Sequence, residues 1–153
     1  NRVAVLDVML ASLTLEGVEI HRVPLMNKDS LDMTPEDHQR IAEVAGQCAE
    51  SHDGVVIVHG TDRLAVSGET CVRLLGTPEV PIVFTGAMRP YELRTTDALQ
   101  NLTEAMFAAG VLEPGVYCSA HGRVLKFPGV PSTEDGSVKF AVVAEVGEST
   151  ASG

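Results

Sequence analysis

Thr61 and Asp62 form the pair of side chains in this sequence that is best suited to chemistry. A threonine hydroxyl is a weak nucleophile that needs a neighbouring base or a lysine. The adjacent carboxylate can hold an ammonium group or orient a proton shuttle. Gly60 removes a side chain that would block a ligand and lets the chain turn sharply. The alternative is that Thr61 and Asp62 only N-cap a helix starting at residue 64. Spacing alone favours neither reading.

Two other polar segments carry groups that could join this pair. Residues 27–32 include Asp29 and Ser30, and residues 85–90 include Ala87 and Arg89. The Gly-Ala pair at 86–87 allows close approach of a small ligand, and an arginine can hold a carboxylate or an intersubunit salt bridge. The alternative for the second segment is a tight turn in which a proline fixes φ.

The histidines and cysteines point to no metal site. No two histidines are four residues apart, and no two cysteines form a CxxC pair, so we expect no zinc. His59 ends the apolar run before Thr61, where a structural role fits better than a general base. Cys48, Cys71 and Cys118 are far apart and odd in number, which predicts free, buried thiols.

Alternating strands and helices must position the polar segments. Apolar spacing predicts helices over 2–13, 35–51, 64–75 and 97–109, and strands over 18–25, 55–58, 81–84, 115–120 and 138–146. Residues 123–127 either pair with the strand at 115–120 or continue beyond a turn. This alternation favours right-handed βαβ crossovers and an α/β fold: a three-layer αβα arrangement with a doubly wound, mostly parallel sheet.

In such a sheet the C-terminal ends of the strands share one edge, where ligands bind. Ser30, Thr61, Asp62 and Ala87 are therefore expected to converge. We expect one domain over 1–146 and a frayed tail over 147–153. The helix at 2–13 lacks a clear N-cap and no Met stands at position 1, so we expect a further segment before Asn1.

Composition excludes several classes of partner. A formal charge of -10 and the lack of a basic stripe exclude nucleic acid and an anionic membrane surface. No apolar run approaches the roughly 20 residues of a membrane-spanning helix. The hydrophobic share of 44% is enough for a sizeable core in 153 residues. We expect a cytoplasmic enzyme or binding domain.

Three motifs in order resemble those of the bacterial-type L-asparaginase family, the threonine amidohydrolases. Residues 53–62 read DGVVIVHGTD, similar to its DG-hydrophobic-HGTD motif. Residues 81–90 read PIVFTGAMRP and are followed by Asp97 and Asn101-Leu102, similar to its GAMRP block. Residues 29–33 read DSLDM, similar to its substrate-binding loop. The resemblance covers about residues 25–125 and implies the fold of that family's N-terminal domain.

The resemblance implies hydrolysis of the side-chain amide of asparagine, or of a related small amide, without metal or organic cofactor. Thr61 matches the family's second catalytic threonine, and Asp62 the carboxylate that holds the substrate's α-ammonium group. Ser30 matches the serine that binds the α-carboxylate, Ala87 a pocket wall, and Asp29 and Gly60 lie within the matching motifs. A small amino-acid amide is thus the implied partner, and homo-oligomers, dimers or tetramers, are implied as well.

The sequence also departs from the family pattern. It contains no TGGTI-like loop for the primary nucleophile, it has Arg63 where a small hydroxyl is usual, and it lacks a lysine near residues 130–132, although Lys126 and Lys139 flank that stretch. These departures leave two other hypotheses open. The chain could be a non-catalytic or degenerate binding domain for aspartate- or asparagine-like amino acids, or the amidase part of an amide-transfer complex.

Overall fold

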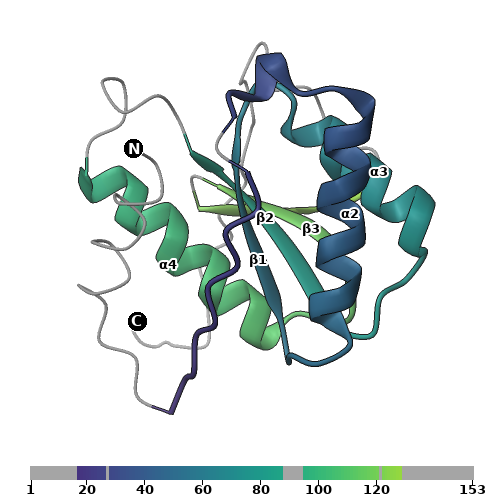
Figure 1. Ribbon diagram of the computed structural model, residues 1–153. Helices are drawn as coiled ribbons and strands as arrows, with labels where there is room; N and C mark the ends of the chain where they lie inside the picture. The colour runs from purple at the N-terminus through teal and green to yellow at the C-terminus, as the bar shows by residue number, and fades with distance from the viewer. Residues whose placement is uncertain (1–16, 27, 88–94, 121, 129–153) are drawn as a thin grey trace.

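A mixed, mostly parallel sheet forms the centre of the molecule (Figure 1). The computed structural model describes residues 17–26, 28–87, 95–120 and 122–128. The strands are β1 (Val55–Gly60), β2 (Pro81–Ala87), β3 (Gly115–Ala120) and β4 (Arg123–Lys126), in that spatial order. β1, β2 and β3 are parallel, and β4 pairs antiparallel with β3. The strands predicted at 55–58, 81–84 and 115–120 are confirmed, and the first two extend further into the polar segments.

The short connection between β3 and β4 decides between the two readings of residues 123–127. Ala120 pairs with Arg123, so the strands form a tight hairpin. Gly122 has a φ of 77°, a conformation that glycine adopts without steric cost. β4 is therefore the edge strand beside β3 and does not continue away from the sheet.

The helices begin and end at the signals present in the sequence. They are the short 3-10 helix η1 (Ser30–Asp32) and the α-helices α2 (Pro35–Ala49), α3 (Leu64–Leu75) and α4 (Thr95–Val111). Thr34 caps α2 by accepting from the Asp37 N–H at 3.2 Å, while the Asp37 carboxylate accepts from the Thr34 N–H at 2.9 Å. Gly76, with a φ of 66°, ends α3. The predictions at 35–51, 64–75 and 97–109 are confirmed with small shifts of their ends.

The helices cover both faces of the sheet, which confirms the three-layer prediction (Figure 1). α2 and α3 pack with Ile82, Phe84 and Val116 in one core cluster. α4 packs with Val83 and Tyr117 in another. Neighbouring residues of a strand point to opposite faces, so the alternation of 82, 83 and 84 between the two clusters places α4 opposite α2 and α3.

This arrangement contradicts the prediction that every crossover is right-handed. The sheet steps in one direction from β1 to β2 to β3, all parallel. α3 joins the first two strands across one face, whereas α4 joins the next two across the other. The two crossovers therefore have opposite hands. About 98% of such crossovers are right-handed, which is why the sequence pattern alone favoured that hand for both.

The predicted strand at 18–25 is wrong. In the described structure this segment has no strand assignment, and Val18 and Val23 are 53% and 52% exposed. Only its end joins the core, where Leu25 and Met26 pack against the cluster beneath α2 and α3. Val18, Ile20 and Val23, which lie in the predicted strand, are thus left on the surface. The helix expected at 2–13, the strand at 138–146 and the tail at 147–153 lie outside the described residues.

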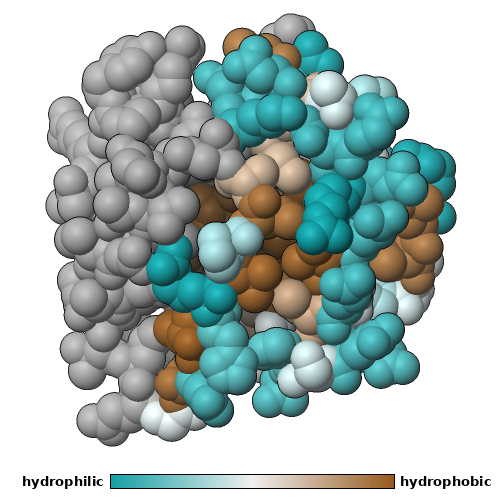
Figure 2. Space-filling model, in the orientation of Figure 1, coloured by the Kyte–Doolittle hydropathy of each residue, from teal (hydrophilic) through white to brown (hydrophobic). Residues whose placement is uncertain are grey.

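β1 is an edge of the described sheet, and its apolar side chains remain partly open. Val55, Val56 and Ile57 are half-buried, and Val58 is 38% exposed. Figure 2 shows apolar side chains gathered in the region between α2 and the segment that leads into η1. The described helices include none long and apolar enough to cross a membrane.

Candidate functional site

The loop carrying Ser30 lies directly against the end of β1. A Cβ atom placed on Gly60 would lie 2.9 Å from the Ser30 Oγ and 3.1 Å from its Cβ. Ser30 is fully buried, and its Oγ accepts a hydrogen bond from the Arg63 N–H at 3.3 Å. Gly60 has no left-handed φ, so the sharp turn expected there is not its role. It makes room for the serine instead.

The ends of β1 and β2 also meet at residues without bulk. His59 is in register with Gly86, and Gly60 with Ala87. A Cβ atom on Gly86 would lie 2.7 Å from the Thr61 Cγ2, so the threonine methyl packs over the glycine. The structure thus brings Ser30, Gly60, Thr61 and the Ala87 backbone to one sheet edge.

The opposite crossovers explain why this edge can hold a ligand. The helix that follows β1, α3, packs on one face of the sheet, and the helix that follows β2, α4, packs on the other. Ligands of open α/β sheets bind outside the carboxyl ends of the strands, where the chain proceeds to helices on different faces. Thr61 lies at the start of the first connection.

The helix-capping reading of Thr61 and Asp62 is wrong. The N-cap of α3 is Arg63, and no side chain makes a capping hydrogen bond there. The backbone serves instead: the Thr61 carbonyl accepts from the Leu64 N–H at 3.4 Å. Thr61 is half-buried and Asp62 is exposed. Neither residue is therefore the N-cap of α3.

Asp29 has a local structural contact. Its Oδ1 accepts from the Leu31 N–H at 3.1 Å, which caps η1 and shapes the loop that presents Ser30. Ala87 is placed by its backbone, which is in register with Gly60. Arg89 lies outside the described residues.

Behind the site lies a chain of buried polar side chains that sequence reasoning missed in part. The Ser67 Oγ lies 2.6 Å from the His38 Nδ1 and 2.7 Å from the His59 Nε2. The His59 Nδ1 lies 2.7 Å from the Gly60 carbonyl oxygen. Burial lowers the pKa of His38, with the Asp37 carboxylate raising it and the Arg63 guanidinium lowering it further. The structural role expected for His59 fits these contacts.

One signal in the sequence could have found His38. It stands three residues before Ile41, on the apolar stripe that continues through Ala45 to Ala49. A histidine on such a stripe is buried and needs a hydrogen-bond partner. Its partner Ser67 is 29 residues away, and no local pattern indicates that pairing.

The lysine at position 126 lies far from the site. It points along the sheet toward Gly115, where a Cβ atom would lie 3.2 Å from the Lys126 Cε. Gly115 begins β3, whereas the site is at the ends of the parallel strands. The Lys126 Nζ lies 5.8 Å from the centre of the Tyr117 ring. Lys126 is therefore at the opposite end of the sheet, and Lys139 lies outside the described residues.

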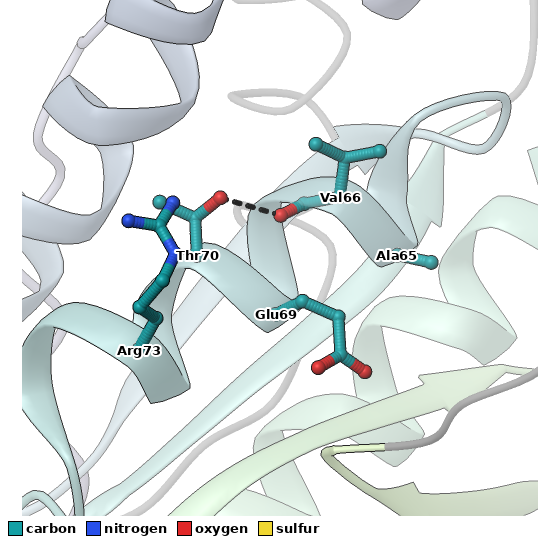
Figure 3. Close-up of a pocket in the computed structure, with 5 residues that line it drawn as sticks. All are labelled: Ala65, Val66, Glu69, Thr70 and Arg73. Atoms are coloured by element: carbon teal, nitrogen blue, oxygen red, sulfur yellow. Dashed lines mark hydrogen bonds between the residues drawn. The ribbon is translucent and has the colours of Figure 1, made fainter.

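A shallow hollow along α3 is separate from the strand ends (Figure 3). Its lining comes from that helix alone: Ala65, Val66, Glu69, Thr70 and Arg73. The Thr70 hydroxyl donates to the Val66 carbonyl at 2.7 Å within the helix (Figure 3). A surface built by one helix converges on no ligand, so we place no function there.

The cysteines and possible metal ligands add no group to the candidate site. Cys48, Cys71 and Cys118 are free, which agrees with the prediction, although only Cys71 is fully buried. Burial raises the pKa of the Cys71 thiol to about 12. In the part of the chain that the structure describes, no group of three His, Cys, Asp or Glu side chains could hold a metal ion.

Comparisons with known proteins agree on one family. Residues 3–138 match the model for "Asparaginase, N-terminal". The chain is 32% identical over 110 residues to the L-asparaginase of Thermococcus kodakarensis, covering 72% of this chain and 34% of that protein. The solved structure of that enzyme superposes with a TM-score of 0.66 over the same shares of the two chains.

Two other relatives carry different names. L-asparaginase 1 of Escherichia coli is 40% identical over 86 residues, covering 56% of this chain and 25% of that protein. A glutamyl-tRNA(Gln) amidotransferase subunit from Thermoplasma acidophilum is 31% identical over 117 residues, covering 76% of this chain and 26% of that protein. The chain thus spans between a quarter and about a third of the length of these three relatives.

Proposed function

Because this chain belongs to the asparaginase family, we propose that it forms the substrate-binding edge of an amidohydrolase that releases ammonia from L-asparagine or a related small amide. The observation that carries the proposal is the packing of Ser30 and Thr61 around two glycines at one sheet edge. A small zwitterionic substrate needs hydroxyl and carboxylate groups close together, such as those of Ser30, Thr61 and Asp62.

Each of the converging residues has a role in this proposal. Asp62, exposed beside Thr61, holds the substrate's α-ammonium group by a charge-assisted hydrogen bond. The Ser30 hydroxyl accepts from the Arg63 N–H and, since a hydroxyl also donates, gives its hydrogen to the α-carboxylate. Asp29 holds the loop that presents Ser30. Gly60 and Ala87 form the floor and wall.

In the proposed reaction a threonine oxygen attacks the amide carbon. The C–N bond breaks, and the nitrogen leaves as ammonia with the hydroxyl proton, giving an acyl-enzyme ester. Water then hydrolyses the ester and releases aspartate. Thr61 is the threonine of this chain assigned to the chemistry, with Asp62 as its neighbouring carboxylate. The reaction as written requires no metal or organic cofactor.

The test is ammonia release from asparagine by the protein carrying its native N-terminus. Thr61→Ala should lower kcat/KM by at least about 100-fold, the scale of losing a positioned catalytic group. Thr61→Ser keeps the hydroxyl and is the matched control, with a smaller loss expected. Equal activity in Thr61→Ala and the unmodified protein would contradict the assignment of Thr61.

A degenerate binding domain is the second candidate. It is supported by the position of Lys126 at the far end of the sheet and by the bulk of Arg63 at the site. Calorimetry that detects aspartate binding, together with no ammonia release, would favour this candidate. An absence of aspartate binding would eliminate it.

A role in amide transfer is a third candidate, because one of the relatives is named as an amidotransferase subunit. Co-purification of a large second subunit would favour it. We also propose one domain over residues 1–146, a cytoplasmic location and a homodimer or homotetramer. Sedimentation of the purified protein tests the oligomeric state, and a monomer at micromolar concentration would contradict it.

A further inference from the structure

Three buried side chains link both helices of one sheet face to the end of β1. His38 belongs to α2, Ser67 to α3 and His59 to β1. They are 4%, 0% and 3% exposed, and the Ser67 Oγ lies 2.6 Å from one imidazole and 2.7 Å from the other. The two rings are nearly parallel, with an interplanar angle of 13°. Such short contacts between buried groups are ordered hydrogen bonds.

The Gly60 carbonyl oxygen determines which atom is the donor in each hydrogen bond of this group. A carbonyl oxygen only accepts, so the His59 Nδ1 must carry the proton that it shares with the Gly60 oxygen. In a neutral imidazole the His59 Nε2 is then an acceptor, and the Ser67 hydroxyl donates to it. The serine oxygen in turn accepts from the His38 Nδ1–H. With both rings neutral, these three contacts are satisfied by this one arrangement.

The Gly60 carbonyl, the last acceptor of these hydrogen bonds, determines how the backbone enters the site. The Gly60 carbonyl belongs to the planar peptide unit that includes the Thr61 nitrogen. A hydrogen bond that fixes the carbonyl therefore also fixes the direction in which the chain proceeds to Thr61. We propose that His38, Ser67 and His59 are positioning residues that hold this peptide plane, and with it Thr61 and Asp62, against the face covered by α2 and α3.

The first experiment reads the protons directly and does not depend on activity. In the full chain labelled with ¹⁵N-histidine, NMR at pH 7.5 should show His38 and His59 as neutral rings with the proton on Nδ1. Ser67→Ala should shift the signals of both rings. A His59 ring that is protonated at Nε2, or Ser67→Ala signals unchanged from wild type, would overturn the proposed chain.

The second experiment measures positioning and rests on the proposed function. Aspartate binding followed by calorimetry should weaken about 5-fold in Ser67→Ala, since one lost hydrogen bond is worth about 1 kcal/mol. Thr70→Val is the matched control, because it removes a buried hydroxyl of the same helix that bonds only within α3. It should bind aspartate like wild type.

The outcomes separate the two proposals. If wild type binds no aspartate but the NMR signals are as expected, the proposed function fails while the proton arrangement stands. If wild type binds aspartate and both variants weaken it equally, the effect is general destabilisation and the positioning role is wrong. Ser67→Thr keeps the hydroxyl and should recover part of the affinity, which separates a lost hydrogen bond from a lost fold.

Discussion

The two faces of the sheet are built by different means. The face beneath α2 and α3 contains the large rings of Phe84 and Phe127, together with the buried chain of His38, Ser67 and His59. The face beneath α4 is packed by Ala105, Ala108 and Ala109 against Val83 and Tyr117. The first face thus combines apolar bulk with polar groups, whereas the second relies on small side chains.

Close approach is what the α4 face gains from its small residues. A Cβ atom on Gly54 would lie 2.8 Å from the Ala109 carbonyl oxygen, so the helix passes directly over the start of β1. The buried polar chain reaches the end of the same strand from the other face. In the described structure, the α2 and α3 face therefore orients the candidate site, while the α4 face mainly supports the sheet. Four predictions test this division.

Phe84→Ala should have the largest effect. Phe84 is fully buried, and its ring centre lies 6.0 Å from that of His59 and 6.1 Å from that of Phe127. Removing such a ring costs about 3–5 kcal/mol in the free energy of unfolding. Urea denaturation should show this loss, and aspartate affinity should fall too because His59 loses a neighbour. Unchanged affinity in the folded variant would argue against coupling between this core and the site.

Ala105→Leu disturbs the packing of the α4 face and should lower the free energy of unfolding less than Phe84→Ala does. Ala105 is fully buried between α4 and the sheet, so extra methylene groups overpack the contact at about 1–3 kcal/mol. Denaturation should show lower stability, while aspartate affinity measured well below the unfolding transition should stay as in wild type. A loss of affinity as large as that of Phe84→Ala would show that both faces orient the site.

The change of stability with pH should be smaller than the effect of either substitution, and it should depend on His38. Burial lowers the pKa of His38 below its ordinary 6.5, so below that pH the unfolded chain takes up a proton that the folded chain excludes. The contribution of His38 to the free energy of unfolding is therefore fully present above pH 6.5 and decreases as the pH falls below that value.

Denaturation midpoints at pH 7.5 and pH 5.5 measure this loss. His38→Gln removes the titrating ring, so its midpoint should change less between the two pH values than that of wild type. His21→Gln, which changes an exposed histidine, is the matched control. An equal change in wild type and His38→Gln would exclude His38 as the source.

Thiol labelling should give the smallest effect. It tests whether the core beneath α2 and α3 opens to solvent. Cys71 is fully buried in the cluster beneath α2 and α3, and its pKa is raised to about 12. A thiol reagent at pH 8 should leave it unmodified in the folded chain, because the thiolate is the reactive form. Phe84→Ala should allow labelling. Rapid labelling of Cys71 in wild type would mean that this face opens readily.

The parts of the fold that follow from local signals were predictable. A continuous apolar run such as Val55–Val58 predicts a strand, although its side chains are less buried than such a run suggests, and the Thr34 capping box marks the start of α2. Ser30 was expected at this edge from a strand at 18–25 that the described structure lacks. The meeting of Thr61 with the end of β2 did follow, because strand ends of a parallel sheet share an edge. These features depend on short spacing or on a general rule of the fold.

The errors come from features that only tertiary structure decides. Residues 18–25 have an alternating pattern, but the described structure pairs them with no strand. Gly60 was read as a turn residue, whereas the contact that requires a glycine is with Ser30, 30 positions earlier in the chain. The pairing of His38 with Ser67 likewise depends on how two helices pack. The hand of a crossover is set by the assembled sheet.

The opposite hands of the two crossovers also bear on how this site tolerates mutation. The proposed crevice lies at strand ends whose following helices, α3 and α4, pack on different faces, and Gly60 and Gly86 make room there for Ser30 and Thr61. Substitutions of surrounding side chains change the chemistry in the crevice without removing it. Arg63 is an example of such a change, since its backbone still bonds to Ser30. New substrate preferences can therefore evolve, or be selected in the laboratory, at residues 61–63 while the two glycines stay unchanged.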